Sequence, residues 1–142
     1  MRNQIILELE SWLDTKWQHQ GRIKKNQTFD GGIDCVGLIA CINKKFNKNC
    51  IDYTNYKRTP TKNDLIYIFK EKMQEIKNDE IEDGDVIVMK IGRYANHAGF
   101  IVGNSIIHAC AKNGRVCKEV FCNKFKNRAI GFFRFKWLAN HG

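Results

Sequence analysis

Residues 97–109 read HAGFIVGNSIIHA, and this stretch determines the fold class. Apolar residues stand on both sides of Gly103-Asn104, and a glycine at the first of two turn positions is typical of a tight β-hairpin. Because alternate side chains on a strand point to the same face, a turn at this point places Gly99 opposite His108. The stretch therefore predicts two antiparallel strands joined by a two-residue turn.

Further short strands are expected on both sides of this hairpin. Asp83-Gly84-Asp85 is a turn signal in front of the first, and Asn113-Gly114 is the strongest short signal for a second hairpin. An irregular basic piece, residues 124–128, precedes the last. The predicted strands are Val86–Met89, Ala98–Val102, Ile106–Ala109, Val116–Phe121 and Ile130–Phe135.

The first part of the chain shows helical periodicity instead. Apolar side chains recur at three-to-four spacing in residues 1–14 and again in residues 35–46. Asp34 directly precedes the second of these segments, and its carboxylate is suited to accept hydrogen bonds from the first turn. Both segments are predicted to be helices.

A third helix is predicted from Leu65 to Ile76, opened by Thr61 or Asn63. Residues 16–32 have no clear period and many polar side chains, which indicates a loop. Helices followed by antiparallel strands are typical of an α+β fold, here with the helices packed on a sheet of about five strands.

Length and composition restrict the class of protein. The chain has 142 residues, 43% of them hydrophobic and 27% charged, which fits a single folded domain over residues 1–142. Its six cysteines need not form a disulfide framework, because a core of this size does not require one. The net charge of +9 favours anionic partners: nucleic acid, an acidic membrane face or an acidic wall polymer.

The sequence shows neither an export signal nor a membrane span. Glu8 and Glu10 interrupt the apolar residues near the amino terminus, and no run of about 18 apolar residues occurs. We therefore expect a chain without a signal peptide that is made in the cytoplasm.

Cys35 stands where a catalytic thiol would be expected. At the first turn of a helix, the macrodipole and unpaired N–H groups stabilise a thiolate and lower the pKa of the thiol. The same N–H groups can hold an oxyanion that forms on a substrate carbonyl. A buried packing role is the alternative for Cys35, since free cysteine is among the most buried residue types.

Two histidines share a predicted sheet face, and they favour the catalytic role of Cys35 over the packing role. His97 has the same strand parity as Gly99, so it lies diagonal to His108, within reach of its side chain. A thiol activated by one imidazole that a second polar group orients is the general arrangement of a nucleophilic triad. Cys35, His97 and His108 are therefore the candidate catalytic residues.

Five blocks of the sequence follow one another in a recognisable order: SWLDTKWQHQG (11–21), DCVGL (34–38), DGDV (83–86), HAGFIVGN (97–104) and IHA (107–109). Taken together, these blocks resemble the NlpC-type cysteine peptidases, papain-like enzymes of bacterial and phage cell-wall turnover. They look closest to the branch of this family that is encoded with phage tail proteins.

The resemblance implies a papain-like fold and a role for each candidate residue. Cys35 would be the nucleophile, His97 the general base and acid, and His108 the residue that orients the imidazole. The family usually has a tyrosine before the cysteine loop, where this chain has Trp17. The candidate residues for substrate or oxyanion contacts are Trp17, His19, Gln20 and Asp34.

The resemblance also implies the chemistry and the partners. The substrates would be peptidoglycan stem peptides, cleaved at an amide bond through an acyl-enzyme, with no cofactor and no metal. Phage tail components are further candidate partners, and a phage-like particle or another route would deliver the chain to the wall. Nucleic acid is not expected as a partner.

Two other functions remain open at this point. A thiol amidase, deamidase or acyltransferase acting on a protein or lipid would use the same three residues. A basic nucleic-acid-binding module would use none of them, and its affinity would fall steeply with salt.

A metal site is a further alternative. It would draw on His108, Cys110, Cys117 and Cys122, although these cysteines lack the paired two-residue gaps usual in zinc modules. Outside that alternative, Cys41, Cys50, Cys117 and Cys122 are interpreted as packing residues or surface thiols.

Overall fold

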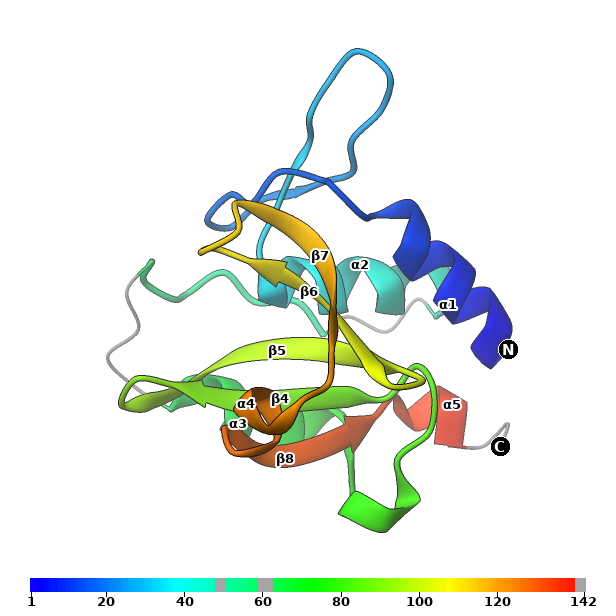
Figure 1. The fold of residues 1–142 in the computed structure, drawn as a ribbon, viewed down its shortest axis with the longest axis vertical. Coiled ribbons are helices and arrows are strands. Elements are labelled where there is room, and N and C mark those ends of the chain that lie inside the picture. The colour runs from blue at the N-terminus through cyan, green and yellow to red at the C-terminus, as the bar shows by residue number, and fades with distance from the viewer. Residues whose placement is uncertain (48–50, 59–62, 140–142) are drawn as a thin grey trace.

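The computed structural model describes residues 1–47, 51–58 and 63–139, and it shows an α+β fold (Figure 1). Within these ranges, six strands form one antiparallel sheet in the order β3-β8-β4-β5-β6-β7. The strands are β3 (Gln74–Ile76), β4 (Val86–Ile91), β5 (Tyr94–Val102), β6 (Ser105–Cys110), β7 (Arg115–Val120) and β8 (Ala129–Arg134). The predicted fold class is confirmed.

The longer helices come first in the chain, as predicted. They are α1 (Arg2–Ser11), α2 (Cys35–Phe46) and α3 (Asp64–Lys72), and both α2 and α3 pack against β5. Short helical turns follow at η1 (Asn78–Glu80), α4 (Asn123–Lys126) and α5 (Lys136–Ala139). Among the described helices, none combines the length and the apolar character that a membrane span requires.

The sheet is buried on both faces because its central strands alternate between two apolar clusters. Val88 and Phe100 face the larger cluster, which contains the buried sides of α1, α2 and α3. Ile87 and Ile101 face a smaller cluster that includes Phe125 of α4. Residues 124–128, predicted to be irregular, overlap the short helix α4. Its Phe125 covers the second face of the sheet.

The hairpin predicted from residues 97–109 is confirmed. Val102 pairs with Ser105 and Phe100 pairs with Ile107, as a two-residue turn requires. A side chain at position 99 would come within 3.0 Å of the Cβ of His108, so Gly99 lies against that histidine. Only glycine fits there without displacing its neighbours.

The second hairpin is confirmed in place. Cys110 pairs with Arg115, so the loop between β6 and β7 contains residues 111–114, with Asn113-Gly114 at its end. The N–H of Gly114 donates to the carbonyl oxygen of Cys110 at 2.9 Å, and Gly114 has a φ of 75°. Glycine adopts this left-handed conformation at no steric cost, which places it at the end of a longer turn.

One predicted boundary is also wrong. The third helix ends at Lys72, and the next residues form β3, where Glu75 pairs with Phe133 of β8. Met73 and Ile76 continue the helical spacing by coincidence, and the long-range pairing with β8 overrides it. Asn63 is the residue before this helix; Thr61 and also Cys50 lie outside the described residues.

The loop predicted for residues 16–32 contains a small hairpin. β1 (Arg22–Ile23) and β2 (Gly32–Ile33) pair with each other, and the segment between them projects from the body of the molecule (Figure 1). A strand of two residues is too short to show alternation, so the sequence pattern does not reveal it.

A buried carboxylate joins the amino terminus to the last strand. Asp85 has a fully buried side chain, and it accepts hydrogen bonds from Nε and Nη2 of Arg134 at 2.9 and 2.8 Å. It also accepts bonds from the N–H of Glu82 at 2.8 Å and from Nη1 of Arg2 at 3.3 Å. The turn before β4 is therefore attached to both α1 and β8.

Asp85→Ala is expected to destabilise the protein by about 3 kcal/mol or more, because it leaves the half-buried guanidinium of Arg134 without its main partner. The matched control is Asp14→Asn, which weakens an exposed pair with Arg115 and is expected to cost about 0.5 kcal/mol or less. Urea unfolding followed by circular dichroism measures both. Equal losses in the two variants would contradict the role assigned to Asp85.

Candidate active site

A cleft of about 940 Å³ contains the three candidate catalytic residues. Cys35 enters it from the start of α2, His97 from β5 and His108 from β6. The segment 53–58 forms another part of the lining. Residues that are far apart in the chain therefore meet in one cavity, as the sequence analysis predicts.

Cys35 is the first residue of α2, and it is half-buried. Its sulfur lies 3.9 Å from the carbonyl oxygen of Asn96, and it also receives a hydrogen bond from the backbone N–H of Ala98. These two residues flank His97, so the contacts place the thiol against β5 at the position of the histidine.

The thiol of Cys35 is protonated in the free protein. Burial, and then the negative charge of Asp34, raise the pKa of Cys35 to about 12. Hydrogen bonds from the N–H groups of Ala98 and Val36 act in the opposite direction but do not compensate. The expectation that the helix amino terminus lowers the pKa of Cys35 is therefore wrong for the free protein, because desolvation outweighs the hydrogen bonds from these N–H groups.

A chain of hydrogen bonds runs from His97 into the sheet. Nε2 of His97 lies 2.7 Å from Nδ1 of His108, and Nε2 of His108 lies 2.5 Å from Oε2 of Glu119 on β7. His108 is 2% exposed and His97 is 9% exposed, so water does not compete with these contacts. Glu119 is thus a site residue that the sequence analysis missed.

The pKa shifts of the three residues in this hydrogen-bond chain determine which of them are charged. Burial and the neighbouring His108 lower the pKa of His97 to about 3, and burial lowers the pKa of His108 although Glu119 acts to raise it. Burial acts to raise the pKa of Glu119, but the contacts with His108, Lys124 and Asn113 together outweigh it and the pKa is lowered. At neutral pH the chain therefore consists of one carboxylate and two neutral imidazoles.

Only one arrangement of protons satisfies every contact. A carboxylate only accepts, so Nε2 of His108 carries a proton and donates it to Glu119. Nδ1 of His108 is then an acceptor, and Nε2 of His97 must donate to it. Nδ1 of His97 is left with a free lone pair, which is the form that a general base requires.

Asp34 organises the entrance of the site. Its carboxylate caps α2 by accepting from the N–H of Gly37 at 2.9 Å, and it accepts from the N–H of Gln20 at 2.7 Å. It also pairs with Nη1 of Arg22 at 2.9 Å and accepts from the hydroxyl of Tyr56. Both oxygens are bound by the chain itself, and a contact of Asp34 with substrate stays a prediction.

The other predicted contact residues all line the cleft. The ring of Trp17 lies 5.3 Å from the guanidinium of Arg58, and the ring of His19 meets Tyr56 edge-on at 5.4 Å. The side chain of Gln20 is occupied, because its Nε2 donates to the carbonyl oxygen of Thr54 at 2.6 Å. Trp17 and His19 are the two of these residues that present rings to the cavity.

The segment 53–58 was not predicted to take part in the site. Tyr53 lies near Cys35, and burial is the main cause that raises the pKa of the Tyr53 phenol. Tyr56 donates to Asp34 and accepts from Nη2 of Arg22 at 3.0 Å. A polar segment without periodicity shows no pattern from which these long-range contacts could be predicted.

Glu119 did have a signal in the sequence. A two-residue turn at Asn113-Gly114 would place it directly opposite His108 on the neighbouring strand. The longer turn shifts the register, so Cys117 is opposite His108 and Glu119 is diagonal to it on the same face. The side chain reaches His108 in either register.

Part of the predicted metal set also converges. His108, Cys110 and Cys117 have ligand atoms within 4.8 Å of one another, whereas Cys122 is exposed and belongs to no such group among the described residues. Cys41, interpreted as a packing residue or surface thiol, is half-buried on α2.

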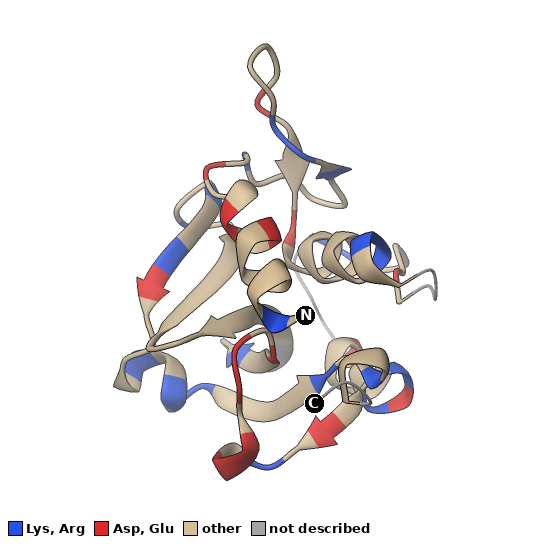
Figure 2. Ribbon diagram, turned by 90° about the vertical axis from the view of Figure 1, so that its right-hand side faces the viewer, with Lys and Arg blue, Asp and Glu red and all other residues tan. Residues whose placement is uncertain are grey.

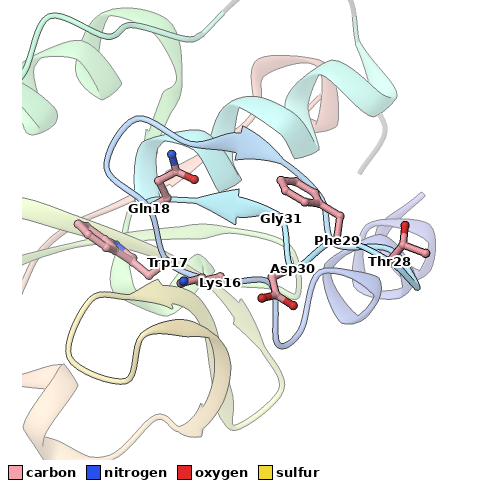
Figure 3. A pocket seen from close by; sticks show the side chains of 7 residues that line it. All are labelled: Lys16, Trp17, Gln18, Thr28, Phe29, Asp30 and Gly31. Carbon is pink, nitrogen blue, oxygen red and sulfur yellow. The ribbon is translucent and has the colours of Figure 1, made fainter.

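A smaller hollow of about 430 Å³ lies beside the cleft, and Trp17 lines both. Figure 3 shows its two walls, formed by Lys16 to Gln18 and by Thr28 to Gly31. The lining contains neither a histidine nor a cysteine, so the chemistry is assigned to the larger cleft.

Figure 2 marks basic and acidic residues at several separate places along the ribbon.

Comparison with known proteins identifies the family. The model of the NlpC/P60 family matches residues 14–134, and no curated protein matches the chain. The fold is similar to the NlpC/p60 domain of the peptidoglycan hydrolase SagA, with a TM-score of 0.69 at 14% identity, covering 95% of this chain and 99% of that one.

Two further solved structures share the fold. An NlpC/P60 family protein from Bacillus cereus has a TM-score of 0.68 at 15% identity, covering 95% of this chain and 40% of that one. The peptidoglycan hydrolase RipB from Mycobacterium tuberculosis has a TM-score of 0.60 at 16% identity, covering 94% of this chain and 63% of that one. The family match spans most of the chain and includes all three candidate catalytic residues, and the chain therefore belongs to the NlpC/P60 family.

Proposed function

We propose that this protein is a cysteine peptidase that cleaves an amide bond in peptidoglycan stem peptides. The observation that carries the proposal is the hydrogen-bond chain from Glu119 through His108 to His97, which ends in the same cleft as Cys35. SagA and RipB, which share this fold, are described as peptidoglycan hydrolases, and this supports the choice of substrate.

The reaction begins from a neutral thiol and a neutral imidazole. Nδ1 of His97 takes the proton of the Cys35 thiol as the sulfur attacks the carbonyl carbon of the substrate. The imidazolium then gives this proton to the leaving amine, the C–N bond breaks, and a thioester remains on Cys35. A water molecule, deprotonated by His97, hydrolyses the thioester and releases the acid.

Charge separation is confined to the moment of reaction. The pKa of Cys35 is raised and the pKa of His97 is lowered, so a thiolate–imidazolium pair is unfavourable in the free protein. Hydrogen bonds of a catalytic base are often long in a free enzyme and shorten when substrate binds. Substrate binding therefore completes the contact between the sulfur and the imidazole.

A backbone N–H at the start of α2 and a side chain from residues 17–20 would hold the oxyanion. The N–H of Cys35 belongs to the first helical turn, where no carbonyl of the same helix can accept from it. A side chain from residues 17–20 would supply the second contact, and the ring of His19 faces the cleft. The expected oxyanion site therefore lies between the helix start and this segment.

The charge of the cleft fits a substrate that carries carboxylates. Five basic residues line it: Lys57, Arg58, Lys112, Lys124 and Arg128. Two of the acidic residues in the lining, Asp34 and Glu119, already have partners within the protein. The free charge that a stem peptide meets is therefore mainly positive.

Delivery by a phage-like particle, with phage tail components as partners, is also part of the proposal. The neighbouring genes test it: tail genes beside this one would support delivery by a particle, and cell-wall synthesis genes would contradict it.

Cys35→Ser is expected to lower the release of stem-peptide fragments by about three orders of magnitude or more, because a hydroxyl cannot replace the thiol at this site. The matched control is Cys41→Ser on the same helix, which should retain activity because that thiol packs against the core and donates to the carbonyl of Arg22 at 3.8 Å, away from the histidines. Mass spectrometry of digested muropeptides measures the products. Equal activity of wild type and Cys35→Ser would contradict the proposal.

The reactivity of Cys35 is expected to rise with pH well beyond the range of an ordinary thiol. Because its pKa is raised to about 12, the thiolate fraction grows about tenfold per pH unit, whereas free cysteine levels off above about pH 8.5. Alkylation by iodoacetamide, read by peptide mapping from about pH 6 to about pH 10 with free cysteine as the control, measures this. A plateau at or below about pH 7 would show a stable ion pair instead.

Glu119→Leu is expected to lower kcat on the order of tenfold to a hundredfold with a smaller effect on KM, because the orientation of His108 is lost but not the cleft. Glu119→Gln keeps an acceptor oxygen and should restore part of kcat. The control is Glu10→Gln, which affects an exposed pair with Lys118. A rise in KM without loss of kcat would show that Glu119 contacts substrate instead of positioning His108.

A further inference from the structure

The β6–β7 hairpin brings two thiols and an imidazole together on one face. Cys117 is directly opposite His108 across the two strands, and Cys110 follows His108 by two residues on the same strand. Their ligand atoms all lie within 4.8 Å of one another, and Sγ of Cys117 is 3.7 Å from Nε2 of His108. The reaction proposed above uses neither thiol.

These distances are close to those of a metal centre. Two ligands of a tetrahedral zinc ion, one sulfur at about 2.3 Å and one nitrogen at about 2.1 Å, are separated by about 3.6 Å. The pair of Cys117 and His108 already has this separation, and Cys110 needs to move by only about 1 Å to complete three ligands. Two thiolates and an imidazole are the donors that zinc prefers over magnesium or calcium.

The surroundings provide a fourth ligand and a route for the ion. Oε2 of Glu119 lies 3.8 Å from Sγ of Cys117, so the carboxylate is placed to supply an oxygen. Cys110 is half-exposed and lines the cleft, while Cys117 is buried beneath it. An ion entering from the cleft therefore meets Cys110 first. Nδ2 of Asn113 donates to Sγ of Cys117 at 3.3 Å and so helps to hold this side chain in place.

We propose that His108, Cys110 and Cys117 form an inhibitory site for a soft divalent cation such as Zn²⁺. The sequence spacing of these residues does not resemble a zinc module, because the pairing of the two strands, and not a local motif, brings the ligands together. Inhibition rests on the proposed function, since it acts through the base of the peptidase reaction.

The ion would inhibit the enzyme by moving the proton of each histidine from Nε2 to Nδ1. When Nε2 of His108 binds the metal, its proton moves to Nδ1, which then donates to Nε2 of His97. His97 in turn carries its proton on Nδ1, the nitrogen that should accept from Cys35. Both rings stay neutral, the two thiols release their protons to solvent, and Glu119 loses its hydrogen bond with His108. The base is therefore blocked without any large movement of the protein.

Cobalt binding tests the site independently of catalysis. The full chain with Cys35→Ser, reduced, is titrated with Co²⁺, and we expect the visible absorption of a tetrahedral ion together with thiolate-to-cobalt charge transfer. Adding Cys110→Ser or Cys117→Ser should remove most of the charge-transfer band, and adding the exposed Cys122→Ser should not. A spectrum without thiolate bands, or one that only Cys122→Ser changes, would overturn the site.

Zinc inhibition tests the consequence in wild type. Turnover should fall with Zn²⁺ and return with EDTA, and the concentration for half inhibition should rise at least about tenfold in Cys117→Ser, with each variant normalised to its own metal-free rate. An unchanged concentration would show that zinc acts at Cys35, which overturns the inhibitory mechanism. If wild type has no peptidase activity the proposed function fails, whereas the cobalt spectra still decide the metal site.

Discussion

The site depends on one constraint, that His108 is bound at both of its ring nitrogens. One nitrogen lies 2.5 Å from the carboxylate of Glu119 and the other lies 2.7 Å from His97. A neutral imidazole has one donor and one acceptor, so fixing the first contact determines the second. The proton on His97 is therefore set by a carboxylate on β7, which acts through His108. Burial of both rings maintains this arrangement of protons, because it keeps both imidazoles neutral at neutral pH.

A second group of contacts brings the nucleophile to this chain. Asp34 caps α2 and at the same time binds Gln20, Arg22 and Tyr56. The helix that carries Cys35 is thereby joined to the β1–β2 region and to the segment around Tyr56. Burial is the main reason that the pKa of Cys35 is raised, and the charge of this same carboxylate adds to the effect. Asp34 therefore contributes both to the position of the nucleophile and to its protonation.

The parts predicted correctly from the sequence are those with a local signal. The Gly103-Asn104 turn determines the pairing of β5 with β6, and strand parity then places His97 beside His108. Cys35 is the first residue of its helix because Asp34 is a good cap. The parts that could not be predicted have long-range causes: β3 exists because β8 pairs with it, and Tyr53 approaches Cys35 through a segment without periodicity. The pKa of Cys35 belongs to the same class, since desolvation depends on the folded surroundings and not on the helix start alone.

Both the catalytic proposal and the metal proposal concern which nitrogen of each imidazole carries the proton. Long-range proton–nitrogen correlation NMR of the ¹⁵N-histidine-labelled protein at neutral pH reports this directly. The account predicts that His97 and His108 are both neutral with the proton on Nε2, leaving Nδ1 of His97 as an acceptor. A proton on Nδ1 of His97 in the metal-free protein would contradict it.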